Sequence, residues 1–277
     1  MGKINHEHMI GHHMRGGKAT KESMLIMVEA GYRTMQVMAG NRFRLDPQAV
    51  SILGPDFFEK TNFLILYHLP YTVNVVKGDV FYNNLKRDLK IFYFRLLEAG
   101  QIPFVVVHPG RNKAEPDKEE YWANLFMEEV ANYWHEGYFM LETMAYKYDC
   151  LARIDRLWPF INGLGSKHIK MCLDTEHSFA SGFHYNQLVD NGKCDIATIK
   201  AVHMNAVPPE VHFGKGLDRH GVTYLRDSKD IDNLKIFIRS LGNKSIPMYF
   251  ERHSFDYFEG DLEFVIETKY EQGTSEG

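Results

Sequence analysis

The sequence has little cysteine and no long apolar run, and both absences narrow the classes of protein to consider. Its three cysteines, Cys150, Cys172 and Cys194, are too few and too scattered for a disulfide framework or a cysteine-type zinc site. No apolar stretch approaches the ~20 residues of a membrane span, and the first residues lack the charged-then-apolar build of a signal peptide. We therefore expect a cytoplasmic protein in a reducing compartment, with no membrane partner.

The sequence also lacks a surplus of basic residues. It contains 32 Lys and Arg against 36 Asp and Glu, for a formal net charge of −4. Proteins that hold nucleic acid through phosphate contacts usually show a Lys/Arg surplus, so nucleic-acid binding here would need another source of positive charge. Histidine, by contrast, is abundant, with 14 residues. The positions of these histidines in the sequence indicate their role.

Short apolar runs alternate along the chain with amphipathic helical patterns. Three helical patterns, over residues 19–30, 85–99 and 121–136, stop before Gly31, Gly100 and Gly137, which suit a left-handed C-cap. Eight repeats of strand and helix predict an α/β fold, a (β/α)8 TIM barrel forming one domain over residues 1–270, with a flexible tail at 271–277. The main alternative is an open doubly wound sheet. The eight expected strands are 9–13, 33–38, 63–68, 104–108, 138–142, 169–174, 199–203 and 247–251.

Six successive predicted strands end in a residue that can bind a metal. The carboxyl ends of barrel strands face one mouth, so these side chains should converge although they lie far apart in sequence. A ring of imidazoles and carboxylates packs poorly and binds metal well. The six residues are His68, His108, Glu142, Asp174, His203 and Glu251.

Two local motifs extend this ring to nine candidate ligands. Asp174-Thr175-Glu176-His177 adds His177, and Asp218-Arg219-His220 adds Asp218 and His220. A catalytic zinc ion uses about three or four protein ligands and keeps one position open for water, so nine ligands predict more than one ion.

The same residues lie in segments that resemble the endonuclease IV family of abasic-site endonucleases. The resemblance runs in order through nearly the whole chain, and the segments around Asp174 and Asp218 are the most specific. The matching segments are Ile10-Gly11-His12-His13, His68-Leu69-Pro70-Tyr71-Thr72-Val73-Asn74, His108-Pro109-Gly110, Leu141-Glu142-Thr143-Met144-Ala145, Cys172-Leu173-Asp174-Thr175-Glu176-His177-Ser178-Phe179-Ala180-Ser181-Gly182, His203-Met204-Asn205, Gly214-Lys215-Gly216-Leu217-Asp218-Arg219-His220 and Ile246-Pro247-Met248-Tyr249-Phe250-Glu251.

The resemblance implies three divalent metal ions, most often zinc, with manganese as an alternative at one site. It places the first ion on His68, His108 and Glu142; the second on Glu142, Asp174, His203 and Glu251; and the third on His177, Asp218 and His220. Glu142 and Glu251 are then the catalytic carboxylates. Such ions would more than offset the negative net charge where a phosphate must sit.

The activity implied is cleavage of double-stranded DNA on the 5′ side of an abasic site. A hydroxide between the paired ions attacks the phosphorus in line, the third ion stabilises the leaving oxygen, and the products carry a 3′-hydroxyl and a 5′-deoxyribose phosphate. We expect a monomer that contacts DNA through five residues near the barrel mouth: Arg42, Arg44, Tyr71, Asn74 and Arg219.

The chain departs from the family pattern in two loops that should shape the DNA-facing rim. After Glu142, Met144-Ala145-Tyr146-Lys147 replaces a glycine-rich stretch, and after His220, Gly221-Val222-Thr223-Tyr224 replaces Leu-Gly-x-Gly.

Three other functions stay open at this stage. A single-metal sugar isomerase or epimerase of the same barrel superfamily would need only Glu142, Asp174, His203 and Glu251. Other metal-dependent hydrolysis of phosphoesters and a non-catalytic metal-binding role are the remaining alternatives. The additional histidines favour the nuclease, because a one-metal site has no use for them.

Overall fold

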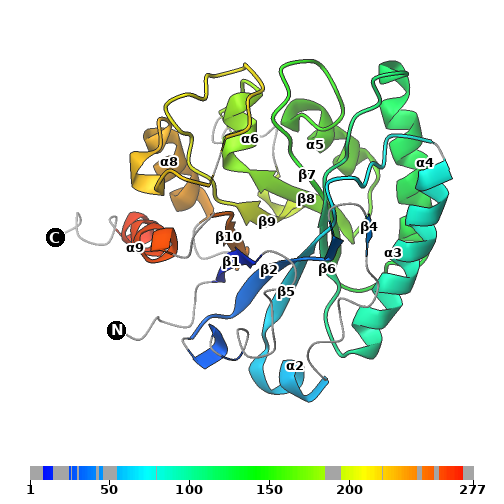
Figure 1. Ribbon diagram of the computed structural model, residues 1–277, viewed down its shortest axis with the longest axis horizontal. Helices are drawn as coiled ribbons and strands as arrows, with labels where there is room; N and C mark the ends of the chain where they lie inside the picture. Colours follow the sequence, from blue (N-terminus) through cyan, green and yellow to red (C-terminus); the bar gives the residue numbers. More distant parts are fainter. Residues whose placement is uncertain are drawn as a thin grey trace.

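Eight parallel strands close into a barrel in the computed structural model (Figure 1). The structure describes residues 9–14, 25, 27–29, 31–41, 44–45, 55–78, 80–184, 195–219, 221–241, 245–252 and 256–270. The barrel order is β1-β10-β9-β8-β7-β6-β5-β2, so β1 closes the ring between β10 and β2. The strands are β1 (Ile10–Met14), β2 (Thr34–Met38), β5 (Leu64–His68), β6 (Phe104–Val107), β7 (Tyr138–Glu142), β8 (Ile169–Asp174), β9 (Ile199–His203) and β10 (Met248–Phe250).

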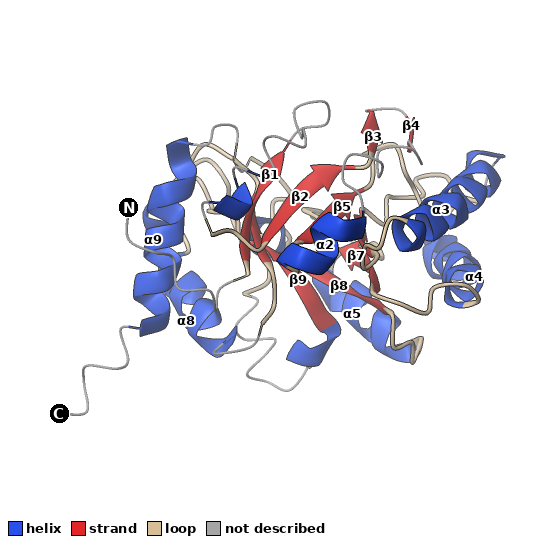
Figure 2. Ribbon diagram, turned by 90° about the horizontal axis from the view of Figure 1, so that it is seen from below, coloured by secondary structure: helices blue, strands red, loops and turns tan. Residues whose placement is uncertain are grey.

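Helices surround the ring of strands (Figures 1 and 2). A two-stranded ribbon, β3 (Gly40–Asn41) and β4 (Arg44–Leu45), follows β2. Among the described residues, no helix is both long and apolar enough to cross a membrane. The helices are α2 (Pro55–Thr61), α3 (Val80–Glu98), α4 (Glu119–Ala131), α5 (Ile154–Gly163), α6 (Thr175–Ala180), α8 (Ile231–Leu241) and α9 (Asp256–Tyr270), with 3-10 turns η1 (Pro116–Lys118), η2 (Ile196–Thr198) and η3 (Leu225–Asp227).

The apolar core has two layers, and their alternation along each strand positions the site. In β5, Leu66 belongs to the cluster inside the barrel, whereas Ile65 and Tyr67 belong to the larger cluster under the helices. Because strand side chains alternate between faces, the residue two positions after an interior residue also faces inward. The same step leads from the other interior residues Val106, Met140, Cys172, Ala201 and Tyr249 to His108, Glu142, Asp174, His203 and Glu251.

The closed barrel confirms the predicted fold and excludes the open sheet. All eight predicted strands are present, with ends shifted by at most one residue. The helix predicted over 121–136 is wrong at its end, because α4 stops at Ala131 and Asn132 caps it. Gly137 lies beyond this cap, has a positive φ of 63° and leaves no room for a side chain, because a Cβ there would lie 1.9 Å from the Pro103 carbonyl oxygen. Most of the predicted helix 19–30 and all of the tail 271–277 lie outside the described residues.

Candidate metal centre

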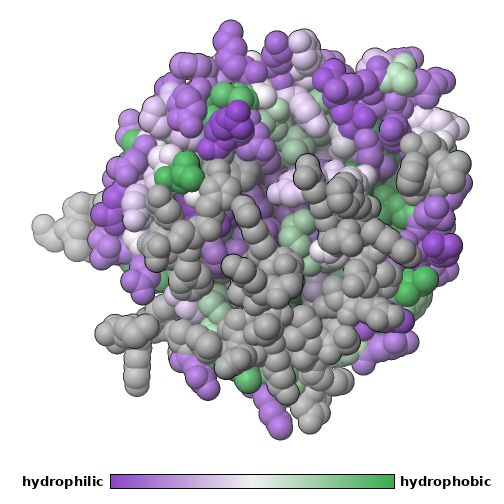
Figure 3. All heavy atoms as spheres, viewed as in Figure 1, coloured by the Kyte–Doolittle hydropathy of each residue, from purple (hydrophilic) through white to green (hydrophobic). Residues whose placement is uncertain are grey.

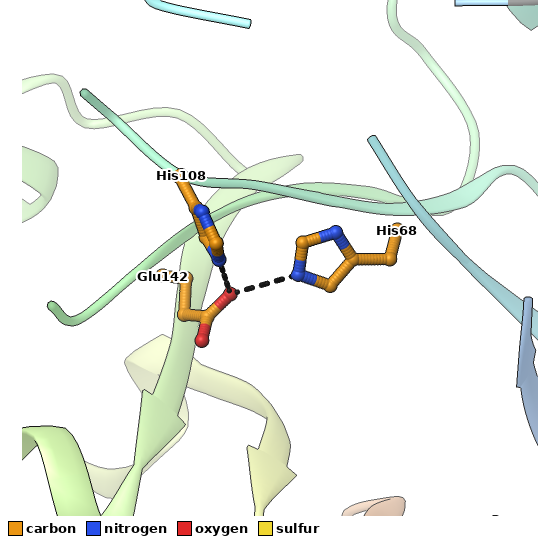
Figure 4. A group of neighbouring side chains, drawn as sticks. All are labelled: His68, His108 and Glu142. Carbon is orange, nitrogen blue, oxygen red and sulfur yellow. Dashed lines mark hydrogen bonds and ion pairs between the residues drawn. The ribbon is translucent and has the colours of Figure 1, made fainter. Parts of the chain in front are cut away.

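Glu142, at the end of β7, lies at the centre of a ring of four histidines. One carboxylate oxygen, Oε2, faces the Nε2 atoms of His68 at 3.2 Å and His108 at 3.0 Å (Figure 4). The other, Oε1, faces the Nδ1 atoms of His203 at 3.0 Å and His177 at 3.4 Å. Glu142 is fully buried. One carboxylate therefore serves two separate groups of ligands, one on each oxygen.

The second group lies around His203, at the end of β9. Its Nδ1 is 3.5 Å from Glu251 Oε2 and 3.9 Å from Asp174 Oδ2. The potential ligand atoms of Glu142, Asp174, His203 and Glu251 all lie within 4.8 Å of one another, as do those of His68, His108 and Glu142. The structure thus brings together all the ligands predicted for the first two ions.

His177 and Asp218 form the described part of the third predicted site. His177, in α6, is placed by the Asp174 side chain, which caps this helix by accepting from the His177 N–H at 2.9 Å. Its Nε2 lies 3.3 Å from Oδ2 of Asp218, which is exposed. The third predicted ligand, His220, lies outside the described residues.

Three of these histidines have one ring nitrogen facing an oxygen that can only accept a hydrogen bond. His68 Nδ1 is 2.7 Å from the Leu69 carbonyl and His177 Nδ1 is 2.8 Å from the Thr143 carbonyl. His203 Nε2 is 2.7 Å from Oε1 of Gln36. In each ring that nitrogen must therefore donate.

The other nitrogen of each ring then has its lone pair facing a carboxylate. His68 and His203 face Glu142, and His177 faces Asp218. An imidazole lone pair and a carboxylate repel each other unless a proton or a metal ion lies between them. A histidine whose far nitrogen donates to a fixed acceptor is also the usual arrangement of a metal ligand. The donor set therefore fits divalent ions.

The pKa shifts of His203 and Glu142 reflect the close contact between imidazoles and carboxylates. Burial alone would lower the pKa of His203, but the neighbouring Cys172, Glu251 and Glu142 raise it well above its ordinary value. Burial likewise would raise the pKa of Glu142, yet the charges of His203 and His108 hold it well below the usual range. Imidazoles and carboxylates in such close contact are groups that bind a metal ion in their deprotonated forms.

Gln36, in the middle of β2, was not predicted from the sequence. Its side chain is fully buried, and its Nε2 donates to Oε1 of Glu251 at 2.7 Å and to Nδ1 of His13 at 2.6 Å. Its Oε1 accepts from His203, as described above. The reverse amide orientation would place a carbonyl against the Glu251 carboxylate, so the network fixes this one. The sequence signal that could have revealed Gln36 is a polar residue at an inward-facing position of an otherwise apolar strand.

Two further acidic residues near the centre were not predicted as ligands. Glu176 is fully buried, and its carboxylate lies within 4.8 Å of ligand atoms of Asp174 and His177. Its Oε1 also accepts from the Arg219 N–H at 3.3 Å, which ties the loop of Asp218 to α6. Glu210 is exposed at the mouth of the pocket.

A pocket of about 380 Å³ opens above these residues. Its walls include Tyr71, Arg219 and Val222, and its floor includes His108, Glu142 and Glu251. The described residues on the face seen in Figure 3 are mainly hydrophilic, with a few scattered hydrophobic ones. The charged side chains that line the pocket, among them Glu142, Arg219 and Glu251, suit a polar or charged ligand.

The predicted DNA contacts occupy different positions around this mouth. Tyr71 is 63% exposed, and its ring centre lies 5.0 Å from that of His108. Asn74 is half-buried, and its amide bonds the Arg111 carbonyl and the Val76 N–H at 3.0 Å each, so it holds loops together. Arg42 lies outside the described residues, and only the main chain of Arg44 is described, in β4.

Comparison with known proteins identifies relatives of this chain. The family model for the xylose isomerase-like TIM barrel matches residues 25–243. "Apurinic-apyrimidinic endonuclease 1" of Plasmodium falciparum is 26% identical over 76% of this chain and 38% of its own length. "Probable endonuclease 4" of Sulfurihydrogenibium is 23% identical over 73% of this chain and 74% of its own length. The chain thus spans well under half of the Plasmodium relative.

Solved structures show the same barrel. Endonuclease IV from Thermus thermophilus superposes with a TM-score of 0.71 at 19% identity, covering 95% of this chain and 99% of that one. D-psicose 3-epimerase superposes with a TM-score of 0.59 at 10% identity, covering 95% and 96%. Together with the sequence relatives, these matches confirm the resemblance to the endonuclease IV family that the strand-end motifs indicated.

Proposed function

Because the chain belongs to the xylose isomerase-like TIM barrel family, we propose that it is a metal-dependent endonuclease that cleaves DNA on the 5′ side of abasic sites. The relatives named for this activity support the proposal, as do the two groups of side chains around Glu142 that could hold divalent ions. Zinc is the ion that such a set of imidazoles and carboxylates favours.

The observation that carries the proposal is the position of Glu142 between two groups of histidines. His68 and His108 approach one of its oxygens and His203 the other, at 3.0 to 3.2 Å. A carboxylate approached from both sides in this way could hold two divalent ions, which would supply the positive charge that a phosphodiester displacement needs.

The side chains around the pocket have separate tasks in this reaction. Divalent ions bound here supply positive charge for the phosphate and lower the pKa of a nucleophilic water. Glu142 and Glu251 orient the reacting groups through their fixed oxygens, the latter held by Gln36 and by Asn205 Nδ2 at 3.2 Å. Tyr71, exposed beside His108, fills the duplex gap left by the rotated abasic nucleotide, and Arg219 holds a neighbouring phosphate.

The rival function is a one-metal isomerase or epimerase, whose barrel this chain shares. Glu142, Asp174, His203 and Glu251 alone would satisfy it. It gives no account of His68 and His108, whose Nε2 atoms converge on the opposite oxygen of Glu142, or of the pair His177–Asp218. These extra ligands favour the nuclease.

The test combines metal content with cleavage. Purified protein should carry about three zinc ions per chain and cut a duplex containing a tetrahydrofuran abasic analogue. Glu142→Gln should abolish cutting and lower metal content at two sites, because an amide cannot replace a shared carboxylate. Glu210→Gln removes a carboxylate from the same pocket, outside the predicted ligands, and should keep the metal content. One metal per chain, or cutting by Glu142→Gln within tenfold of the parent, would contradict the proposal.

A further inference from the structure

Two loops beside the metal pocket bring two cations onto one aromatic ring. Arg111 follows β6, and Tyr146, Lys147 and Tyr148 follow β7 where the family pattern is glycine-rich. The Arg111 guanidinium lies 5.2 Å from the ring centre of Tyr148 and 5.8 Å from that of Tyr146. The Lys147 ammonium lies 4.7 Å from the ring centre of Tyr148, which is itself 54% exposed. Cation–π contacts of this kind hold both charges in place.

These two charges have no carboxylate partner within the described part of the chain. The acid nearest to Lys147 in sequence, Asp149, pairs instead with Nη1 of Arg156 at 3.5 Å. Two like charges against one ring repel each other, and an anion bridging them relieves that repulsion. The N–H groups of a guanidinium are the donors that pair with phosphate.

Buried side chains hold these loops in register with the metal site. The carboxylate of Glu119 is buried and accepts from the N–H groups of Asn112 and Leu151, each at 2.8 Å, which ties the two loops together. Asn74 donates to the Arg111 carbonyl and so links the loop of Tyr71 to the same frame. The cations therefore occupy a fixed position at the rim.

The loop that carries Asp218 packs against the same segment. A Cβ at Gly216 would lie 2.4 Å from the Lys147 main-chain nitrogen, so the two loops are in close contact. The Gly216 φ of +66° also favours glycine at this position. Backbone of the Asp218 loop thus lies directly beside Lys147.

We propose that Arg111, Lys147 and Tyr148 form a phosphate clamp for the DNA strand next to the abasic nucleotide. Arg111 and Lys147 each contact a backbone phosphate, and Tyr148 is the positioning residue that holds them. The clamp rests on the proposed function for its substrate. It adds local positive charge at the rim of a chain whose formal net charge is −4.

The test measures how the affinity for an undamaged duplex depends on salt, which requires no cutting. Each phosphate contact adds about 0.9 to the slope of log K against log salt concentration on duplex DNA. Arg111→Gln/Lys147→Gln should therefore lower the slope by about 1.8 and weaken binding about 30-fold at 0.15 M salt, with little difference near 1 M. Tyr148→Leu should lose part of the slope, and Tyr148→Phe should keep it because the ring remains.

The control removes the same charge from the opposite end of the barrel. Lys200 lies 5.3 Å from the ring centre of Tyr138, and both stand at the amino ends of their strands. Lys170, the second residue of β8, lies at the same end and donates to the Ser166 carbonyl at 3.0 Å. Lys170→Gln/Lys200→Gln should keep the parental slope. Equal slopes for the two double variants, or for Tyr148→Leu and the parent, would overturn the clamp.

A cleavage assay distinguishes a failure of the clamp from a failure of the proposed function. With abasic duplex, the Arg111→Gln/Lys147→Gln variant should show a raised KM and a kcat within about threefold of the parent, with its metal content intact. If the parent fails to cut abasic DNA but the slope falls as expected, the clamp stands and the endonuclease proposal fails. If the parent cuts and the variant keeps both the KM and the slope, only the clamp fails.

Discussion

Replacing Gln36 by leucine should weaken the binding of one metal ion and leave the others in place. The side chain fixes two ligands of the predicted second ion, by donating to Glu251 at 2.7 Å and accepting from His203 at 2.7 Å. Leucine has a similar size but can hold neither. His203 would then be free to turn, and its Nε2–H would lose its acceptor in a fully buried position.

The expected magnitude follows from these bonds. A hydrogen bond to a charged group contributes about 1.5–3 kcal/mol, which corresponds to roughly 10- to 150-fold in affinity. Losing a partner that orients a metal ligand typically costs about 10- to 100-fold in metal affinity. We therefore expect zinc at this one position to dissociate about 10- to 100-fold more readily from Gln36→Leu than from the parent.

The assay is a zinc titration against a competing chelator, followed by elemental analysis after dialysis at a fixed free zinc concentration. Gln101→Leu is the matched control, because Gln101 is also buried and accepts from the Tyr67 hydroxyl at 2.6 Å, away from the predicted ligands. Gln101→Leu should bind zinc like the parent. Parental zinc affinity at every position in Gln36→Leu would refute the reasoning.

Three further outcomes are expected. Asp218→Ala should lose about one metal per chain and slow cutting strongly, and full metal content would remove Asp218 from the site. Tyr71→Ala should weaken binding of abasic duplex by about 5- to 100-fold at fixed salt, with unchanged metal content, and equal affinity would rule out its role in filling the gap. Burial and then Arg252 lower the pKa of His12 to about 4, so folding keeps this ring neutral. The folded state therefore loses stability as the pH falls from 6.5 toward 4, because the unfolded chain binds this proton more readily. The loss in the free energy of unfolding is at most about 3 kcal/mol. His12→Leu should reduce the loss of stability in urea unfolding between pH 7 and pH 4.5, and an unchanged loss would contradict the assignment.

Much of the fold could be predicted because the sequence of each strand shows which of its side chains face the barrel interior. Runs such as Leu66-Tyr67-His68 and Met140-Leu141-Glu142 alternate between the two apolar layers and end in a ligand on the interior face. That alternation was enough to place six strand ends around one mouth. The end of α4 could not be predicted in the same way, since the pattern continues past Ala131 while the chain already turns at Asn132.

The supporting residues of the site were harder to predict. Gln36 contacts residues 167 and 215 positions away in sequence, so only the closed barrel brings it to His203 and Glu251. Glu119 was hidden for a similar reason: it begins α4 like an ordinary first-turn acid, yet its carboxylate bonds two loops. Sequence patterns show which side chains face inward, but the partners of a polar side chain depend on how distant strands align.

The closure of the barrel by β1 has a consequence for the order in which the molecule opens. β1 joins β2 to β10, the elements that carry Gln36 and precede Glu251, and its own His13 receives the second hydrogen of the Gln36 amide. Detaching β1 would remove His13 from the Gln36 amide and open the barrel between β2 and β10. β1 supplies none of the predicted metal ligands, so bound ions should slow amide hydrogen exchange in β5 to β10 more than in β1. The metal centre would then hold β5 to β10 together, while β1 is the strand most able to open.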